Sequence, residues 1–287
     1  MFEILLVLQQ LIASLSHIIA KDITKDVSPN LVLLLRASIA AFVYTIWIVY
    51  SKKYKIKIDK KDYYKLIILG IINIPINQFL FFIAISKTTA PNVSLAYALT
   101  PIFVFIIAFF YLGEKLSTKR ILGIIIAVLG TIVLLSEKGL KFNTDGLIGD
   151  TLALVASLSW AFYTIIGKQL IQKYNPIYIT GLTMIIGLIT YLPFLPFSNI
   201  DYSLIIHLDT LDYLQLLYLG TFTSAIGYAI WYYALTKIDA SKLSVFNNLQ
   251  PALTATLSFF IFGTPITLLF VVGAAMILLG VYVTQRG

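Results

Sequence analysis

The sequence predicts an all-α integral membrane protein with ten transmembrane helices, arranged as two inverted five-helix repeats around a central cavity. Three observations predict this class: the composition, ten long apolar stretches and an internal repeat. Of the 287 residues, 59% are hydrophobic and only 12% are charged. Soluble domains average about 45–50% apolar and about 25% charged residues. The composition therefore excludes a soluble enzyme.

The ten apolar stretches have the length of membrane spans, because a helix needs roughly 20 residues to cross the hydrocarbon core. Their apolar character is continuous, whereas the 3.6-residue alternation of a half-buried surface helix is missing. The first stretch is too long for a signal peptide and has no small-residue cleavage site, so we expect it to be retained. The expected spans are residues 3–20, 31–50, 64–86, 92–112, 120–136, 151–170, 177–197, 213–235, 243–262 and 267–284.

The net charge of +8 sits in the short loops between these spans. Such a distribution orients membrane proteins, since cytoplasmic loops collect Lys and Arg. With both termini in the cytoplasm, fifteen of the 21 Lys and Arg residues fall on the inner side. We therefore expect a multi-pass protein of the cell membrane with both termini cytoplasmic, and no nucleic-acid partner.

The second half of the chain repeats the first at a spacing of 150 residues. Gly, Pro, Lys, Asp and Ser carry the register, whereas Leu and Ile would dominate chance matches between apolar segments. A segment near the start, Ala13–Ser16, matches Ala156–Ser159 at a spacing of 143. We therefore expect a first repeat at 1–136, a linker at 137–149 and a second repeat at 150–287. The pairs include Asp62/Asp212, Gly70/Gly220, Lys87/Lys237, Ser94/Ser244, Pro101/Pro251, Gly113/Gly263, Gly123/Gly273 and Gly130/Gly280.

Each predicted repeat holds five spans. An odd number makes the second copy enter the membrane from the opposite side, so the repeats are expected to be inverted. Inverted repeats are typical of alternating-access carriers, in which two halves rock about a site near the midplane.

The segment Phe109–Ser117, with Pro101 before it and Gly123 and Gly130 after it, resembles the EamA family of the drug/metabolite transporter superfamily. The Ala-x-x-x-Ser-x-x-x-x-Leu-x-Pro pattern, which runs from Ala90 to Pro101 and again from Ala240 to Pro251, and Arg36-Ala37 fit as well. The resemblance covers nearly the whole chain. It implies ten helices around a cavity and export or facilitated movement of amino acids and other small metabolites. One departure is Thr264-Pro265 where the first copy has Glu114-Lys115.

Polar and aromatic side chains inside the spans are the candidates for the cavity, because polar groups in hydrocarbon face the bundle interior or a water-filled space. Such amides and hydroxyls also join helices, and aromatic residues also anchor span ends at the interface. His17 could relay a proton or act as a neutral hydrogen-bonding partner. The candidates are His17, Asn73, Asn77, Gln78, Tyr97, Trp160, Tyr163, Tyr228, Trp231, Tyr232, Asn247 and Asn248.

Pro101 and Pro251 predict kinks in the fourth and ninth spans. A proline removes the hydrogen bond to the carbonyl four residues earlier, which here belongs to Tyr97 or Asn247. Two kinked helices at equivalent places suggest a paired gate. The alternative is a packing kink satisfied by Ser or Thr, as is common in membrane helices.

Charged residues are rare inside the spans. Arg36 and Lys168 are close enough to span ends to snorkel outward, and we expect a structural ion pair for Arg36. No Asp or Glu lies mid-span, which removes a proton-relay carboxylate and disfavours cationic substrates. We expect the fifth and tenth spans, with their spaced glycines, at the periphery.

The sequence therefore favours a secondary or facilitative transporter that moves a small neutral, zwitterionic or aromatic metabolite, such as an amino acid, by alternating access, with export as the expected direction. We expect no enzymatic activity, cofactor or metal site, and a monomer or homodimer whose partners are its substrate and the lipid bilayer. A passive channel remains the main alternative, against which the inverted repeat argues. The sequence favours an integral-membrane enzyme or a receptor less than a channel, since no nucleotide-binding loop or H-E-x-x-H motif occurs.

Overall fold

The computed structural model describes residues 2–51, 57–114, 117–136, 144–198, 200–262 and 267–287, and every regular element in these ranges is helical. The shorter elements are the 3-10 helices η2 (Lys60–Asp62), η4 (Leu192–Phe197), η5 (Tyr202–His207) and η7 (Val245–Asn248) and the π-helices η3 (Ile72–Gln78) and η6 (Tyr218–Gly227). The α-helices are α1 (Phe2–Ile23), α2 (Pro29–Tyr50), α3 (Tyr63–Ile71), α4 (Phe79–Lys87), α5 (Ala90–Ala98), α6 (Thr100–Leu112), α7 (Thr118–Ser136), α8 (Thr144–Ile171), α9 (Pro176–Tyr191), α10 (Thr210–Leu217), α11 (Tyr228–Leu235), α12 (Ala240–Ser244), α13 (Leu249–Phe262) and α14 (Leu268–Gln285).

Several of these elements follow one another directly and form longer helical segments, each of which coincides with an expected span. Within the described ranges, seven segments are long and apolar enough to cross a membrane. The expected spans 120–136, 213–235 and 243–262 are also helical, at α7, α10–α11 and α12–α13, but are not among those seven. The seven are Glu3–Ile23, Pro29–Tyr50, Lys60–Lys87, Asn92–Leu112, Gly146–Ile171, Pro176–Phe197 and Leu268–Gln285.

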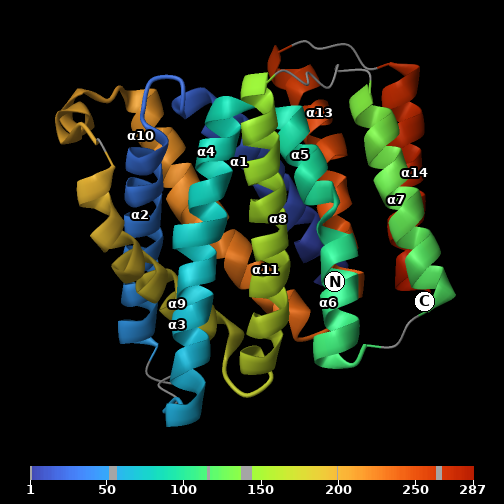
Figure 1. Ribbon diagram of the computed structural model, residues 1–287, viewed down its shortest axis with the longest axis horizontal. Helices are drawn as coiled ribbons and strands as arrows, with labels where there is room; N and C mark the ends of the chain where they lie inside the picture. Colours follow the sequence, from blue (N-terminus) through green and yellow to red (C-terminus); the bar gives the residue numbers. More distant parts are fainter. Residues whose placement is uncertain (1, 52–56, 115–116, 137–143, 199, 263–266) are drawn as a thin grey trace.

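The long helices stand side by side in one bundle, with their connections at the two ends (Figure 1). Both ends of the chain lie in the lower half of that view. Near the C-terminus, Lys242 Nζ donates to the carbonyl oxygen of Gln285 at 3.2 Å, which ties α12 to the end of α14.

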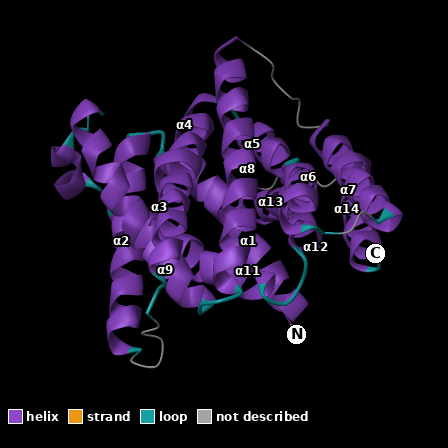
Figure 2. Cartoon of the chain, turned by 60° about the horizontal axis from the view of Figure 1, so that its bottom comes forward, coloured by secondary structure: helices purple, strands orange, loops and turns teal. Residues whose placement is uncertain are grey.

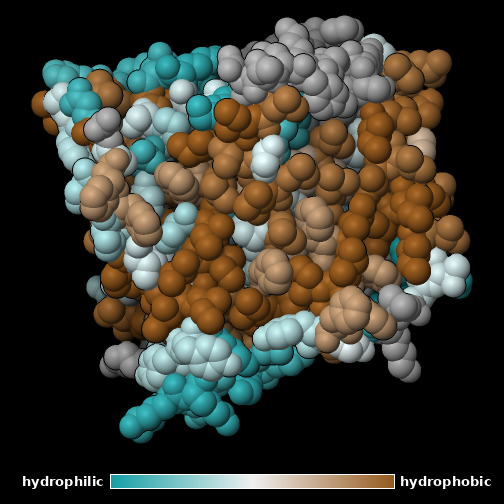
Figure 3. Space-filling model, in the orientation of Figure 1, coloured by the Kyte–Doolittle hydropathy of each residue, from teal (hydrophilic) through white to brown (hydrophobic). Residues whose placement is uncertain are grey.

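The surface carries an apolar band of the kind that contacts lipid. Hydrophobic side chains cover the middle of the face shown in Figure 3, and hydrophilic residues gather toward its upper and lower edges. Large apolar side chains are strongly exposed on the helices, among them Phe42 at 65% and Phe110 at 80%. Water-facing surfaces rarely expose contiguous apolar patches of such size, so the band supports the membrane class predicted from composition.

The helices α7 and α14 form a pair at one edge of the bundle (Figures 1 and 2), so the peripheral position predicted for the fifth and tenth spans is confirmed. A Cβ atom on Gly123 would lie 2.7 Å from the carbonyl oxygen of Gly280, and one on Gly130 would lie 2.8 Å from that of Gly273. Only glycine permits backbones to approach so closely. Because the residue numbers rise along α7 as they fall along α14, the two helices run antiparallel.

The kinks predicted at the two prolines are confirmed as interruptions of the helices. The helix is interrupted at Leu99, between α5 and α6, just before Pro101. In the second half of the chain, the 3-10 turn of η7 separates α12 from α13, which contains Pro251. A 3-10 or broken turn is the expected consequence where proline cannot donate a backbone hydrogen bond.

Part of the predicted linker 137–149 is helical in the structure, and the division of the chain into repeats and linker stays a prediction. Helix α8 begins at Thr144, and residues 137–143 lie outside the described residues. The polar residues Asp145 and Gly146 suggested a loop, but the helix extends past the apolar stretch that marked the expected sixth span.

Candidate functional site

A cavity of about 70 Å³ lies inside the bundle, large enough for several water molecules. Its walls come from both halves of the chain and are polar and aromatic. Among the described residues that line it, none is Asp or Glu. The lining residues are Gln9, Ile12, Ala13, Ser16, His17, Arg36, Asn77, Gln78, Phe81, Tyr97, Trp160, Thr223, Gly227, Tyr228, Asn247 and Gln250.

Seven of the residues predicted for the cavity from the sequence line it in the structure. They come from α1, η3, α5, α8, α11 and η7, so six helical elements converge on one space. Both π-helices contribute lining residues, and π-turns in helices are frequent at functional sites. The seven are His17, Asn77, Gln78, Tyr97, Trp160, Tyr228 and Asn247.

The other five predicted residues are not among the residues that line the cavity, and a role for them in substrate binding stays a prediction. Asn73 Nδ2 donates to the sulfur of Met184 at 3.3 Å, and Asn73 Oδ1 accepts from Gln78 Nε2 at 3.0 Å. The amide of Asn248, oriented to satisfy its neighbours, donates to the carbonyl oxygen of Ala98 at 3.1 Å. These amides join helices and hold Gln78 in place.

Two of the three aromatic residues among these five, Tyr163 and Tyr232, stack against each other, and the third, Trp231, packs against the ring of Trp160 at a centroid distance of 5.4 Å. The rings of Tyr163 and Tyr232 are stacked, with centroids 4.9 Å apart, and Tyr232 donates to the carbonyl oxygen of Tyr163 at 3.0 Å. Trp231 Nε1 donates to Thr164 Oγ1 at 3.1 Å. The polar side-chain atoms of Trp231 and Tyr232 are therefore used between α11 and α8, and the hydroxyl of Tyr163 lies 2.9 Å from Thr183 Oγ1 of α9.

Trp160 and Tyr228 form the aromatic wall that does face the cavity. Their rings meet edge to face, with centroids 5.0 Å apart. Trp160 is also backed by Tyr163 at a centroid distance of 5.5 Å. An aromatic wall backed by stacked rings is rigid, and it offers an apolar surface to a ligand.

His17 packs against the rings of Phe81 and Tyr97, which also contact each other. Its ring meets Phe81 at a centroid distance of 5.3 Å and Tyr97 at 5.9 Å. Its Nδ1 atom lies 3.4 Å from Ser94 Oγ. These contacts suit the hydrogen-bonding alternative for His17, and proton relay stays a prediction.

Arg36 corrects an expectation from the sequence. Its side chain is 4% exposed and lines the cavity, so it does not snorkel to the surface. Its Nε donates to Ser224 Oγ at 2.5 Å, and its guanidinium lies 5.4 Å from the centroid of the Phe82 ring. Among the described residues it forms no ion pair, so the expected structural ion pair is wrong.

A network of amides forms another part of the wall, and sequence reasoning missed two of its members, Gln9 and Gln250. Gln10 Nε2 donates to Gln9 Oε1 at 2.7 Å and to Asn247 Oδ1 at 3.2 Å. Gln250 Nε2 donates to Gln10 Oε1 at 2.8 Å. The network leaves Asn247 Nδ2 and Gln250 Oε1 buried without a partner. Two features of the sequence could have indicated these residues. Gln250 is next to Pro251, and Gln9 lies one helical turn before Ala13.

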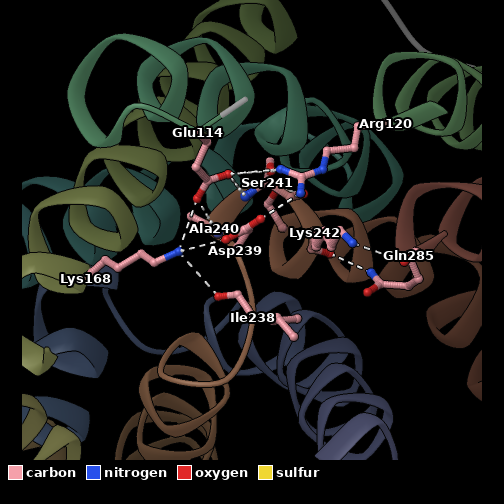
Figure 4. A network of polar contacts seen from close by, with 10 residues as sticks. Glu114, Arg120, Lys168, Ile238, Asp239, Ala240, Ser241, Lys242 and Gln285 are labelled. Carbon is pink, nitrogen blue, oxygen red and sulfur yellow. Dashed lines mark hydrogen bonds and ion pairs between the residues drawn. The ribbon is translucent and has the colours of Figure 1, made fainter. Parts of the chain in front are cut away.

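A second polar cluster lies at the lower end of the bundle in Figure 1, where α6 ends and α12 begins, and Figure 4 shows its side chains converging. We call Glu114, Arg120, Lys168, Asp239 and Ser241 the ion-pair cluster. Glu114 Oε1 accepts from Lys168 Nζ at 3.1 Å, and Asp239 Oδ2 accepts from Arg120 Nη2 at 2.7 Å. The expectation that Lys168 reaches the end of its span is confirmed.

Glu114 also fastens the start of α12. Its carboxylate accepts from the backbone N–H of Ala240 at 2.7 Å and of Ser241 at 3.2 Å. Gly113, with φ +66°, ends α6 in the left-handed conformation that glycine adopts without strain, and this turn aims Glu114 at α12. A residue of the first half thus caps a helix of the second half.

At the opposite end of the bundle, α5 is held by Asp150 of α8. The Asp150 carboxylate accepts from Thr88 Oγ1 at 2.6 Å and from Asn92 Nδ2 at 2.9 Å. The cavity therefore lies between two polar closures, of which the lower one carries the larger number of charges.

These features define a class: a multi-pass helical membrane protein whose bundle encloses a polar and aromatic cavity. Within that class the chain belongs to the EamA-like transporter family, whose model matches residues 1–136 and 147–286. The family predicted from the resemblance of the sequence is therefore confirmed.

Curated relatives of the chain are named as transporters. An uncharacterized transporter of Archaeoglobus fulgidus is 33% identical over 259 residues, which is 90% of this chain and 89% of the relative. The uncharacterized transporter YyaM of Bacillus subtilis is 30% identical over 250 residues, which is 86% of this chain and 81% of the relative. A protein of Salmonella typhimurium named "Probable amino-acid metabolite efflux pump" is 28% identical, with 75% of each chain covered.

The fold also occurs among solved structures. One crystal structure of another protein superposes with a TM-score of 0.76 and 18% identity over 96% of this chain and 98% of that chain. At that identity the likeness concerns the fold alone.

Proposed function

We propose that the protein is a secondary or facilitative carrier that moves a small metabolite across the cell membrane by alternating access between two inverted five-helix repeats. A zwitterionic compound such as an amino acid is the proposed substrate, and export is the proposed direction. The relative named as an amino-acid metabolite efflux pump supports both.

One observation carries the proposal: positions related by the sequence repeat line the cavity in pairs. At the spacing of 143, His17 corresponds to Trp160. At the spacing of 150, three further pairs occur. Both members of each of the four pairs line the cavity, and the pairs at 150 are Asn77 with Gly227, Gln78 with Tyr228, and Tyr97 with Asn247.

The departures from regular α-helix are also repeated, which supports two copies of one unit. The π-helix η3 at Ile72–Gln78 has its counterpart, 150 residues on, within η6 and the start of α11. The break before Pro101 has its counterpart in η7 before Pro251. The family model, which matches the chain in two stretches, supports the same division.

Alternating access follows from such an arrangement, because two equivalent halves can exchange conformations and so exchange the side to which the cavity opens. In this carrier the ion-pair cluster closes the cytoplasmic end, and its bonds between the halves break when that end opens. The breaks at the two prolines provide the paired gate, because the short helices α5 and α12 can tilt at them independently of α6 and α13.

The experiment is counterflow in proteoliposomes that contain the purified protein. Vesicles loaded with an excess of unlabelled amino acids are diluted into a pooled panel of labelled amino acids. A carrier accumulates its label transiently, and the accumulation disappears when the matching unlabelled compound is omitted inside. Equilibration without accumulation, together with conductance, would instead support a passive channel.

A further inference from the structure

We infer that Arg36 binds the carboxylate of the transported compound, so that the carrier selects substrates with a free acid group over their amides, esters and amines. The inference rests on the proposed function, since it assigns a ligand to the same cavity.

The first step is the state of the guanidinium. Arg36 is 4% exposed, yet it forms no ion pair with a described acid. A buried charge that lacks a counter-charge carries a large desolvation penalty. An ionisable residue in a membrane segment therefore points to a functional partner.

The second step is the geometry of its hydrogen bonds. An arginine side chain has five N–H donors in a planar fork. Within the described part of the chain, the one hydrogen bond that Arg36 makes uses Nε, which donates to Ser224 Oγ. The terminal nitrogens thus remain for a ligand, and two parallel N–H donors match the two oxygens of a carboxylate.

The third step is the environment of the cavity that Arg36 lines. Among the described lining residues there is no acid and no second Lys or Arg, so the lining carries one positive charge. A monoanionic group neutralises it, whereas a cationic substrate would add to it. A like charge placed beside a buried cation would be strongly disfavoured.

The fourth step concerns the rest of the substrate. Gln250 and Asn247 line the same cavity. Their atoms Oε1 and Nδ2 are buried without partners, and such atoms in native structures call for an explanation. An acceptor of this kind can take an ammonium hydrogen of an amino acid. The wall of Trp160 and Tyr228 can then take an apolar side chain. Together these groups offer one partner for each part of an α-amino acid.

The test compares acids with their amides in the wild-type protein, so that it does not depend on a variant. Counterflow is measured with labelled L-phenylalanine, L-leucine and L-threonine and with the carboxamide of each, and protein-free vesicles measure leak. We expect the carboxamide of the transported acid to be taken up at least about tenfold less well, because a hydrogen-bonded partner of a charged group is lost. Equal uptake of acid and carboxamide would overturn the inference while leaving the carrier intact.

Variants then assign the selectivity to Arg36. In R36Q we expect the preference for acid over carboxamide to fall below about twofold, and in R36K, which keeps the charge without the fork, to be intermediate. R286Q is the matched control, since Arg286 is exposed near the C-terminus, and it keeps the wild-type ratio. An R36Q protein that transports with undiminished preference for the acid would also overturn the inference. If no label accumulates in wild-type vesicles for any compound, the proposed function itself fails.

Discussion

Gly123 and Gly280 lie against each other so closely that a Cβ atom on Gly123 would meet the carbonyl oxygen of Gly280 at 2.7 Å. The backbones of α7 and α14 come close together there, beside the side chain of Thr284. This contact joins the last helix of the first proposed repeat to the last helix of the second.

The close approach predicts that G123L destabilises the protein. Overpacking a tight contact typically costs about 1–3 kcal/mol, so we expect a lower midpoint of thermal unfolding in detergent. L122A, on the exposed face of the same helix, is the control and should leave the midpoint within the experimental error. A G123L protein as stable as the wild type would mean that α7 and α14 do not pack as described.

Asn247 and Asn248 predict a contrast between two neighbouring residues. Asn247 lines the cavity, so N247A should raise the KM for transport severalfold with little change in the unfolding midpoint. Asn248 joins η7 to α5 and α7, so N248A should lower the midpoint and leave the KM of the remaining folded protein near that of the wild type. Unchanged flux in N247A would count against the assignment of the cavity.

The ion-pair cluster predicts that E114Q opens the cytoplasmic end of the cavity. Breaking a buried ion pair by removing one partner is strongly destabilising to the state that contains it. The chain has no cysteine, so S16C introduces a single thiol into the cavity wall. We expect a membrane-impermeant thiol reagent on the cytoplasmic side to label S16C/E114Q severalfold faster than S16C alone.

The control for this experiment is E3Q, which removes an exposed acid near the N-terminus and should leave the labelling rate unchanged. Equal labelling rates for S16C/E114Q and S16C would mean that the ion-pair cluster does not close the cavity.

The charge distribution predicts the orientation of the chain. Lys173 lies between α8 and α9, and Ser203 lies in η5. In intact cells, K173C should resist an impermeant thiol reagent added outside, and S203C should react. The parent chain without cysteine gives the background. The reverse pattern would place both termini outside.

The fold was largely predictable because the thickness of the hydrocarbon core sets the length of each apolar stretch. Helices α2 and α14 therefore begin and end within a few residues of the expected spans. The π-helices were not predictable, although Pro75 lies inside η3, because a π-turn depends on how neighbouring helices pack. The start of α8 at Thr144 was missed because a helix can extend beyond the apolar stretch with polar residues.

The site was predictable where the repeat constrained it and not elsewhere. His17 and Trp160, or Tyr97 and Asn247, occupy equivalent positions, and both members of each pair line the cavity. Trp231 does not line the cavity, because its indole N–H donates to Thr164 on another helix, a pairing that no sequence spacing reveals. Arg36 was misread because distance from the span end suggested snorkelling, whereas the rotation of α2 turns the side chain toward Ser224.

The glycine contacts at the edge of the bundle have a further consequence under the proposed duplication. Gly123 meets Gly280 and Gly130 meets Gly273, so the same contact is made twice with the roles of the two helices exchanged. A surface that recognises its own copy in this way is isologous, the hallmark of a two-fold dimer. A chain with one repeat could form that dimer only with a copy inserted in the opposite orientation. Fusion of both repeats in one chain supplies the two orientations in equal number from a single translation product.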